Sequence, residues 1–181
     1  SISTLGNSQD FGDLTDPKTG STGCSSSTRA IFSNATLSNS RTNDIDFVTF
    51  ASTGDAADFG NSTVSVAYRT AISNSTRGVI AGGEGPTGTV IDVMDYITIA
   101  STGNAEDFGN LVGNRVSPGG GANSVRGIFA GGSSADEIMY ITISSTGNTQ
   151  DFGDLTAGTT TMTGCSNSTR CVFGGIRNPG Y

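Results

Sequence analysis

The chain of 181 residues contains no histidine and no tryptophan, and Lys18 is its only lysine. Without imidazole, Ser-His-Asp and Cys-His catalytic sites are excluded, as are metal sites built on histidine. The formal net charge is −7, whereas nucleic acids and anionic membranes require clustered Lys and Arg, so neither is expected as a partner. Because no apolar run reaches about 18 residues, we also expect no membrane insertion.

Cysteine and charge are sparse as well. The three cysteines Cys24, Cys165 and Cys171 cannot all pair with one another. Buried free thiols are the favoured interpretation, and one disulfide with one thiol left over is the alternative. Only 14% of residues are charged, while Gly, Ser and Thr number 27, 24 and 25. This composition is typical of a low-complexity linker or of a β-protein with many tight turns.

An internal repeat decides between these two classes. Asp-Phe-Gly occurs four times, and each copy is followed by an Arg that begins an apolar run. The distance from Phe to Arg is 18 residues in every copy, whereas the copies lie 48, 49 and 44 residues apart. A disordered linker has no reason to keep such a register, so residues 1–181 are predicted to form a single domain of four repeats, each with one variable loop.

Each repeat is interpreted as four short strands. The apolar run, for example Arg126-Gly127-Ile128-Phe129-Ala130, is typical of a strand buried on both faces. An alternating segment such as Asp95-Tyr96-Ile97-Thr98-Ile99 predicts the next strand. A third strand is expected around the repeated Phe, and a fourth, more exposed one in the Thr- and Gly-rich segment before the next Arg. Repeats of about 45 residues with four strands indicate an all-β fold, a β-propeller of four blades that are each a four-stranded antiparallel sheet.

The landmarks of each copy resemble those of kelch repeats. The third copy has the apolar strand, the pair Gly131-Gly132, then Tyr140 and Phe152. Kelch blades usually carry Trp at the last landmark, and the first copy has Ser33-Asn34 instead of two glycines. The pairing of Asp-Phe-Gly-Asp/Asn-Leu with Cys-Ser-Ser/Asn-Ser-Thr-Arg is also similar to repeats in virion and tail-fibre proteins of marine phages. This second resemblance implies a virion or extracellular location.

The two ends of the sequence fall within the repeat register. Counted back from Phe11, Ser1 and Ile2 correspond to Thr142 and Ile143, and Tyr181 falls where the next copy's tyrosine begins. Four blades would then close into one ring, with the N-terminal strand completing the last blade; the alternative is a four-repeat window of a longer array. The sequence begins without Met or a signal peptide, which we interpret as processing or as part of a longer chain.

Repeated charges are the candidate site residues. An Arg at the start of a buried strand is expected to pair with the Asp before a repeated Phe. The predicted structural blade latch comprises Arg29, Arg77, Arg126, Arg170, Asp10, Asp58, Asp107 and Asp151. The alternative is a ring of four arginines that lines a channel for an anionic ligand.

A repeated Asn/Asp-x-x-Asp turn offers a second candidate. Its members are Asn7/Asp10, Asp55/Asp58, Asn104/Asp107 and Asn148/Asp151. Calcium takes about six to eight oxygen ligands, and each turn supplies only two repeated side chains, so hydrogen-bonded turn capping is favoured. Asp-Phe-Gly occurs without the other kinase motifs, and we read it as a turn residue, a core aromatic and a glycine. We predict no metal, no cofactor and no catalytic residue.

Three classes of function follow. The favoured one is a non-enzymatic structural or adhesive module of an extracellular assembly, a phage virion or tail appendage. It would contact other assembly proteins, a host surface receptor or a glycan through the variable loops 33–44, 84–93, 133–137 and 175–180. A carbohydrate-binding propeller is the alternative, and an enzyme has little support without histidine.

Overall fold

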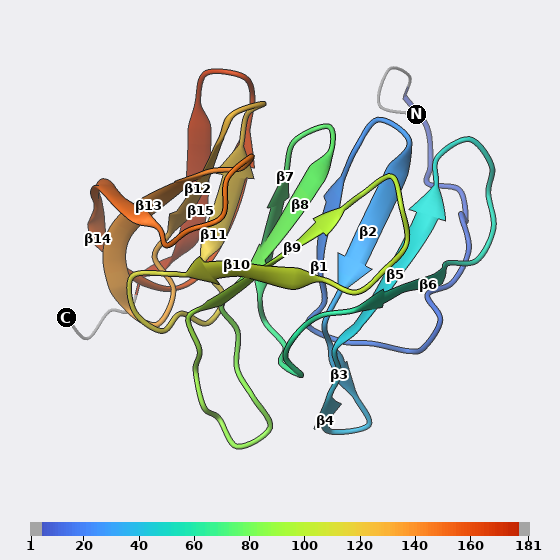
Figure 1. Cartoon of the computed structure of the whole chain (residues 1–181), viewed down its shortest axis with the longest axis horizontal. Coiled ribbons are helices and arrows are strands. Elements are labelled where there is room, and N and C mark those ends of the chain that lie inside the picture. Colours follow the sequence, from blue (N-terminus) through green and yellow to red (C-terminus); the bar gives the residue numbers. More distant parts are fainter. Residues whose placement is uncertain (1–4, 178–181) are drawn as a thin grey trace.

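The computed structural model describes residues 5–177, and within that range the chain forms fifteen β-strands and no helix. The strands form two sheets of four, one sheet of five and a two-stranded hairpin (Figure 1). Every strand pair in these sheets is antiparallel. The prediction of an all-β fold is therefore confirmed.

The first two sheets have the same order of strands. Sheet one contains β1 (Thr22–Ser25), β2 (Arg29–Ser33), β5 (Asp44–Thr49) and β6 (Ala57–Asn61). Sheet two contains β7 (Thr70–Ser73), β8 (Arg77–Ala81), β9 (Val93–Thr98) and β10 (Glu106–Asn110). The hairpin of β3 (Thr36–Leu37) and β4 (Ser40–Arg41) lies between β2 and β5. Each sheet thus has the four strands that the sequence predicts for one blade.

The third sheet departs from the prediction of four separate four-stranded blades. It contains β11 (Gly119–Ala122), β12 (Arg126–Ala130), β13 (Ala135–Thr142), β14 (Gln150–Ser166) and β15 (Cys171–Arg177). The start of β14 pairs with β13, and its end pairs with β15. Among residues 5–177 the fourth repeat therefore extends the third sheet and does not form a sheet of its own.

The long strand β14 has a local cause. Residues 156–163 include five threonines, which favour extended structure, and contain no proline. In the first and third repeats, Pro17 and Pro118 interrupt the corresponding segment. In the second repeat, Tyr68 interrupts it with a φ of 57°. The fourth repeat lacks such interruptions, so one strand continues where the other repeats turn.

The core lies between successive sheets. Within β8, Ile80 packs toward sheet one with Ile31 and Phe59, whereas Val79 packs toward sheet three with Phe108 and Phe129. The continuous apolar run after Arg77 therefore forms a strand that is buried on both faces, as the sequence predicts.

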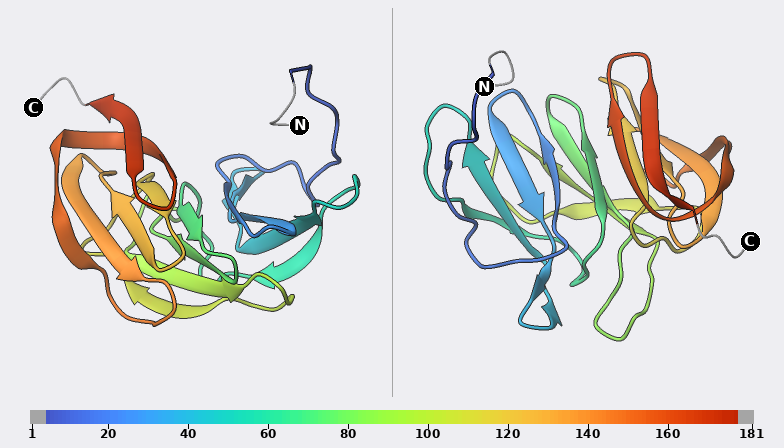
Figure 2. Two further views of the ribbon diagram at one scale, coloured as in Figure 1. Left: turned by 90° about the horizontal axis from the view of Figure 1, so that it is seen from above. Right: turned by 180° about the vertical axis from the view of Figure 1, so that it is seen from behind.

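The sheets follow an open arc, with the first and fourth repeats at its two ends (Figure 2). The innermost strands β1 and β7 are in contact, as are β7 with β11 and β11 with β14. Segments of all four repeats line one cavity of about 300 Å³, namely residues 20–23, 68–71, 117–120 and 161–164. The Thr- and Gly-rich strand predicted to be the more exposed one thus lies at the inner edge of each sheet.

Candidate functional site

The joint between successive repeats is the most regular feature of the molecule. In each joint, the Ser-Thr-Gly-Asn/Asp turn that comes just before one repeated Phe docks on the Phe-Gly-Asp/Asn segment of the repeated Phe one copy earlier in the chain. The turn glycine donates its N–H to the carbonyl of the repeated Phe at 2.7 Å in all three joints, Gly54 to Phe11, Gly103 to Phe59 and Gly147 to Phe108.

Two further hydrogen bonds complete each joint. In the second joint, the N–H of Ala105 donates to the carbonyl of Asn61 at 2.8 Å, and the N–H of Asn61 donates to Asn104 Oδ1 at 3.0 Å. The same two bonds recur in the other joints, on Asp13 with Asp55 and Ala56, and on Asn110 with Asn148 and Thr149. The repeated Asn/Asp before each Asp-Phe-Gly is therefore a capping residue that links two repeats.

The glycine of Asp-Phe-Gly is required by this joint. A Cβ added to Gly60, whose φ is +142°, would lie 2.4 Å from the carbonyl oxygen of Gly103. The same approach is 2.3 Å at Gly12 and 2.5 Å at Gly109. No side chain fits at such a distance, so Asp-Phe-Gly and the Gly-Asn/Asp turn are the two halves of one contact.

The predicted latch aspartates act locally. Carboxylate oxygens of Asp10, Asp58 and Asp151 accept the N–H of the glycine two residues further on, at 3.1–3.2 Å. Asp107 lies at the corresponding position of β10. No group of three or more Cys, Asp or Glu side chains with metal-binding geometry occurs in residues 5–177. The hydrogen bonds agree with turn capping rather than with a calcium loop.

The predicted latch arginines contact aromatic rings. The guanidinium carbons lie 4.3–4.7 Å from the ring centroids, Arg29 over Phe47, Arg77 over Tyr96 and Arg126 over Tyr140. Of the ion pairs found between described residues, none joins these arginines to the predicted aspartates. Because the strand that carries the ring lies between the Arg strand and the Asp strand, the ring meets the guanidinium first.

Two of these arginines also reach the next repeat. Arg29 donates to the carbonyl of Ile99 at 3.1 Å, and Arg77 donates to the carbonyl of Ile143 at 3.0 Å. Arg126 and Arg170 line a peripheral cavity, and none of the four repeated arginines lines the central one. Arg29 and Arg77 therefore link neighbouring sheets, and none of the four arginines lines the cavity between the inner segments.

Buried ion pairs, which the repeat pattern does not predict, hold the interior. Arg69 and Asp95 have side chains with 0% exposure, and their charged groups lie 2.5 Å apart. Arg69 also donates to the carbonyls of Ile80 and Val93 at 2.9 Å. Burial lowers the pKa of Arg69, and the adjacent carboxylate of Asp95 opposes this shift.

The first repeat also contains a buried ion pair, whose cation comes from another repeat position. Asp46, at the position of Asp95, accepts from Lys18 at 2.7 Å and from Thr15 at 2.8 Å, and both charged side chains are buried. The third repeat has Met139 at this position. The one available sequence signal was an Asp at the same place in two otherwise apolar strands. Both carboxylates and both cations have protein partners, and of the Arg69 guanidinium only Nε is buried without one.

The three cysteines are free thiols. Burial raises the pKa of Cys24 to about 12, and a hydrogen bond with Ser73 opposes part of the shift. Burial and the neighbouring Cys165 raise the pKa of Cys171. Cys24 and Cys171 are half-buried and Cys165 is exposed, so the expectation of free thiols agrees with the structure but full burial does not.

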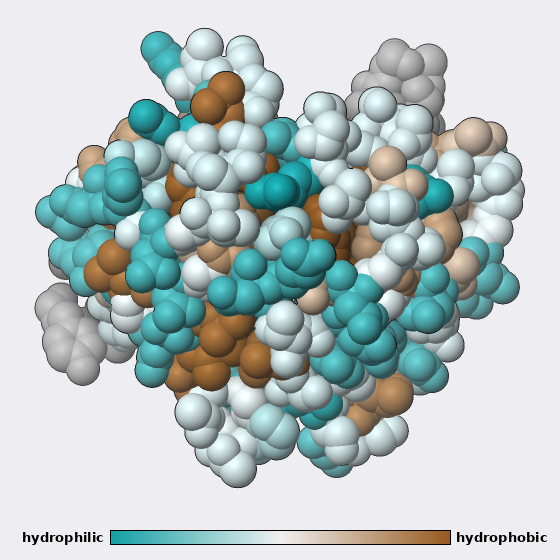
Figure 3. Space-filling view, viewed as in Figure 1, coloured by the Kyte–Doolittle hydropathy of each residue, from teal (hydrophilic) through white to brown (hydrophobic). Residues whose placement is uncertain are grey.

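Length-variable loops gather at one edge of the molecule. The β3–β4 hairpin and the β8–β9 connection project on the same side (Figure 1). Arg41 of the hairpin forms an ion pair of 2.8 Å with Glu84 of that connection, and it stacks on Tyr68 at 4.9 Å. Apolar side chains on the face shown in Figure 3 form separate patches among polar ones. The predicted loop 133–137 lies partly within β13, and residues 178–180 of the last predicted loop lie outside the described residues.

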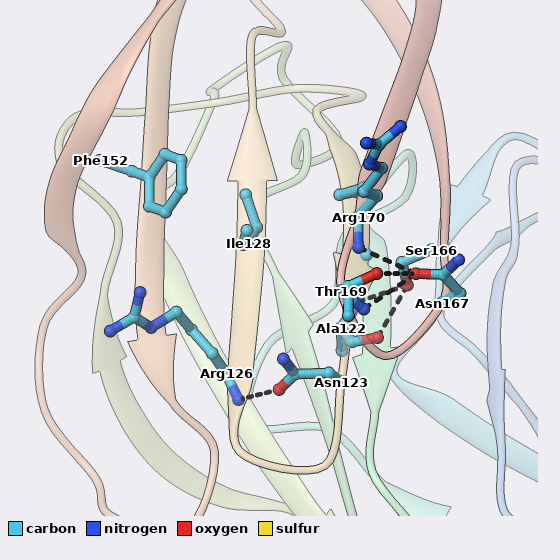
Figure 4. A pocket seen from close by; sticks show the side chains of 11 residues that line it. Ala122, Asn123, Arg126, Ile128, Phe152, Ser166, Asn167, Thr169 and Arg170 are labelled. Atoms are coloured by element: carbon cyan, nitrogen blue, oxygen red, sulfur yellow. Dashed lines mark hydrogen bonds between the residues drawn. The ribbon is translucent and has the colours of Figure 1, made fainter.

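A smaller cavity of about 150 Å³ lies beside the fourth repeat (Figure 4). Arg126, Ile128 and Phe152 line one side of it, and the turn around Asn167 lines the other. Asn167 Oδ1 accepts the N–H groups of Thr169 and Arg170 at 2.8 and 2.9 Å, so this side is a rigid capped turn.

No protein-family model matches this chain, and a search of curated proteins also finds no match. Residues 5–177 contain no helix with the length and apolar character that crossing a membrane would require.

Proposed function

We propose that the chain is a propeller-type scaffold of kelch-like repeats. Four inner segments around one cavity support this architecture, as do two sheets with the same order of four strands. In the proposed propeller, β15 and the end of β14 are the inner half of a fourth blade, and a segment equivalent to the one around Phe11 would be its outermost strand.

The proposed role is a non-enzymatic structural or adhesive module of an extracellular assembly, a phage virion or tail appendage. The main support for this role is the contrast between a framework of repeated contacts and connections that differ from one repeat to the next. Buried ion pairs and repeated joints build the framework, while the β3–β4 hairpin and the β8–β9 connection project together from one edge. Loops on a rigid framework are a common basis for specific contacts. Partners would be other assembly proteins or a host surface receptor.

Two measurements test this role. Detection of the chain by mass spectrometry in purified virions, with stoichiometric copy number, is the expected result; absence from particles that carry the gene would contradict a virion role. For adhesion, the Arg41-containing hairpin 36–41 would be replaced by a two-residue turn, which should abolish binding to isolated host surfaces. Replacement of the capped turn at Asn74–Thr76, in the β7–β8 connection at the opposite edge in Figure 1, is the control.

One observation favours a glycan as the partner. The peripheral cavity combines the exposed ring of Phe152 with guanidinium and amide groups of Arg126, Asn123 and Asn167, a mixture that suits sugar stacking and hydrogen bonding. Specific signals on a glycan array that disappear in Phe152→Ala would support this alternative. An empty array would remove it.

A further inference from the structure

The fourth copy of the joint surface lacks the turn that covers the other copies. Phe59 and Phe108 are 2% and 1% exposed, whereas Phe152 is 52% exposed. Gly153 keeps the joint conformation, with a φ of +141°, yet a Cβ added there would meet nothing within 4 Å. The sequence and backbone of a joint are therefore present at Phe152-Gly153-Asp154 without the partner.

At the edge formed by Arg126 and Phe152, only some of the side-chain contacts of a joint are present. Arg126 stacks on Tyr140 as Arg77 stacks on Tyr96, but among described residues it has no counterpart to the carbonyl that Arg77 binds. In the preceding interface, Ile141 and Ile143 pack in the cluster that contains Val79 and Phe108. The corresponding space beside Ile128 and Phe152 is the cavity of about 150 Å³ (Figure 4).

The complementary half of a joint lies at the other end of the arc. Gly6-Asn7-Ser8 corresponds in repeat register to Gly147-Asn148-Thr149. Residues 5–10 are exposed, and a Cβ added to Gly6 would meet nothing within 4 Å. Ile2 corresponds to Ile143 by sequence and lies outside the described residues. The chain therefore carries one free turn and one free surface of the same contact.

We propose that the N-terminal segment of a second copy of this chain docks on the Phe152 surface, so that copies associate head to tail. By analogy with the three existing joints, Gly6 N–H would donate to the carbonyl of Phe152, and Asp154 N–H would donate to Asn7 Oδ1.

A second copy fits this surface better than the chain's own N-terminal segment. Three joints with equal hydrogen bonds fix how successive sheets meet, and with that geometry the two free halves remain at opposite ends of the arc (Figure 2). A second copy can meet the Phe152 surface while the three existing joints keep their hydrogen bonds. The contact is heterologous, so each added copy presents a new free surface. This inference does not depend on what the variable loops bind.

Sedimentation velocity of the whole chain over a wide range of concentrations, with reductant present, tests the proposal. The sedimentation coefficient should rise with concentration. Gly153→Val places a side chain where the incoming Gly6 carbonyl would lie and should abolish the rise. Gly88→Val is the control, because Gly88 also has a positive φ, of 77°, and a Cβ there meets nothing within 4 Å.

A second pair of variants leaves the folded repeats untouched. Asn7→Ala removes one hydrogen-bond acceptor from an exposed turn and should weaken association about five- to tenfold. Asn7→Asp should associate like the original chain, because Asp55 has this role in the first joint.

Three outcomes overturn the proposal. The first is a chain that stays monomeric at every concentration. The second is association that Gly153→Val and Asn7→Ala leave unchanged. The third is a compact monomer that expands in Gly153→Val, which would mean that the chain's own N-terminal segment occupies the surface. None of these outcomes bears on the loop contacts proposed above, so the two proposals fail separately.

Discussion

The contribution of one joint to the free energy of unfolding can be measured by making the same substitution at two glycines, Gly109 and Gly153. Gly109→Ala places a Cβ 2.5 Å from the carbonyl oxygen of Gly147, at a φ of +137°. Gly153→Ala introduces the same side chain at a φ of +141°, with nothing within 4 Å. Both variants carry the backbone strain of a left-handed alanine, about 1–3 kcal/mol. Only Gly109→Ala must also open a joint.

The cost of opening a joint follows from its bonds. Three hydrogen bonds that all joints share hold the Gly147 turn on the Phe108 segment, at 2.7, 2.9 and 3.0 Å. At about 1 kcal/mol each, their loss makes Gly109→Ala about 3 kcal/mol more destabilising than Gly153→Ala. With a urea m-value of about 2 kcal/mol/M, the unfolding midpoints of the two variants should differ by about 1.5 M.

The assay is urea unfolding followed by far-UV circular dichroism, at a concentration where sedimentation shows the monomer. That condition keeps the Gly153 surface free in both variants. Equal losses of stability in the two variants would refute the reasoning, because the carbonyl contact would then contribute nothing beyond backbone strain.

Three further predictions concern the interior. Arg69→Met should cost about 3–5 kcal/mol in urea unfolding, since it leaves a buried carboxylate unpaired, and adding Asp95→Met should recover most of that loss; no recovery would contradict the buried pair. Arg77→Ala should lower stability by about 1–2 kcal/mol and Arg126→Ala by about 1 kcal/mol less, because only Arg77 also binds a carbonyl; equal effects would argue against that bond. The pKa of Cys24 is about 12 in the folded chain and about 8.5 when unfolded, so above pH 8.5 the unfolded state releases its proton first and stability should fall, by at most about 1.4 kcal/mol per pH unit, up to about pH 12. Cys24→Ala should remove this part of the pH dependence, and an unchanged slope would show that the thiol is not buried.

The repeat register predicts much of the local structure. The apolar run after Arg77 and the alternating segment around Tyr96 are strands at the expected places, because each pattern states which faces are buried. The register also shows that Gly60 and Gly103 are special positions. It does not show that they meet, since the contact joins residues of different repeats whose separation only the packing of the sheets decides.

The charged contacts are harder to predict. Arg29 and Arg77 are predicted to be structurally important because they recur at the same repeat position. Their partners are aromatic rings and backbone carbonyls, which carry no charge pattern in the sequence. The buried charges are supplied by Lys18 and Arg69, which occupy different repeat positions. The register reveals only part of this: Lys18 and Arg115 both lie seven residues after a repeated Phe and pair with acids at equivalent positions, Asp44 and Glu137. The Arg69–Asp95 pair has no repeated counterpart.

The fourth repeat shows a different limit. Its sequence keeps the landmarks Phe152 and Arg170, so four equal blades are the natural expectation. Whether a segment turns or continues depends on single residues such as Pro118, and their absence from residues 156–163 lets β14 join two repeats.

Residue-resolved amide hydrogen exchange tests the repeated joint most directly. The N–H groups of Gly54, Gly103 and Gly147 all donate to a repeated Phe carbonyl, whereas Gly6 is the unpaired copy of the same position. We expect strong protection of the three paired amides, with Gly6 exchanging at the free-chain rate in dilute solution and becoming protected as concentration rises. Protection of Gly6 at every dilution, or exchange of Gly103 at the free-chain rate, would contradict this expectation.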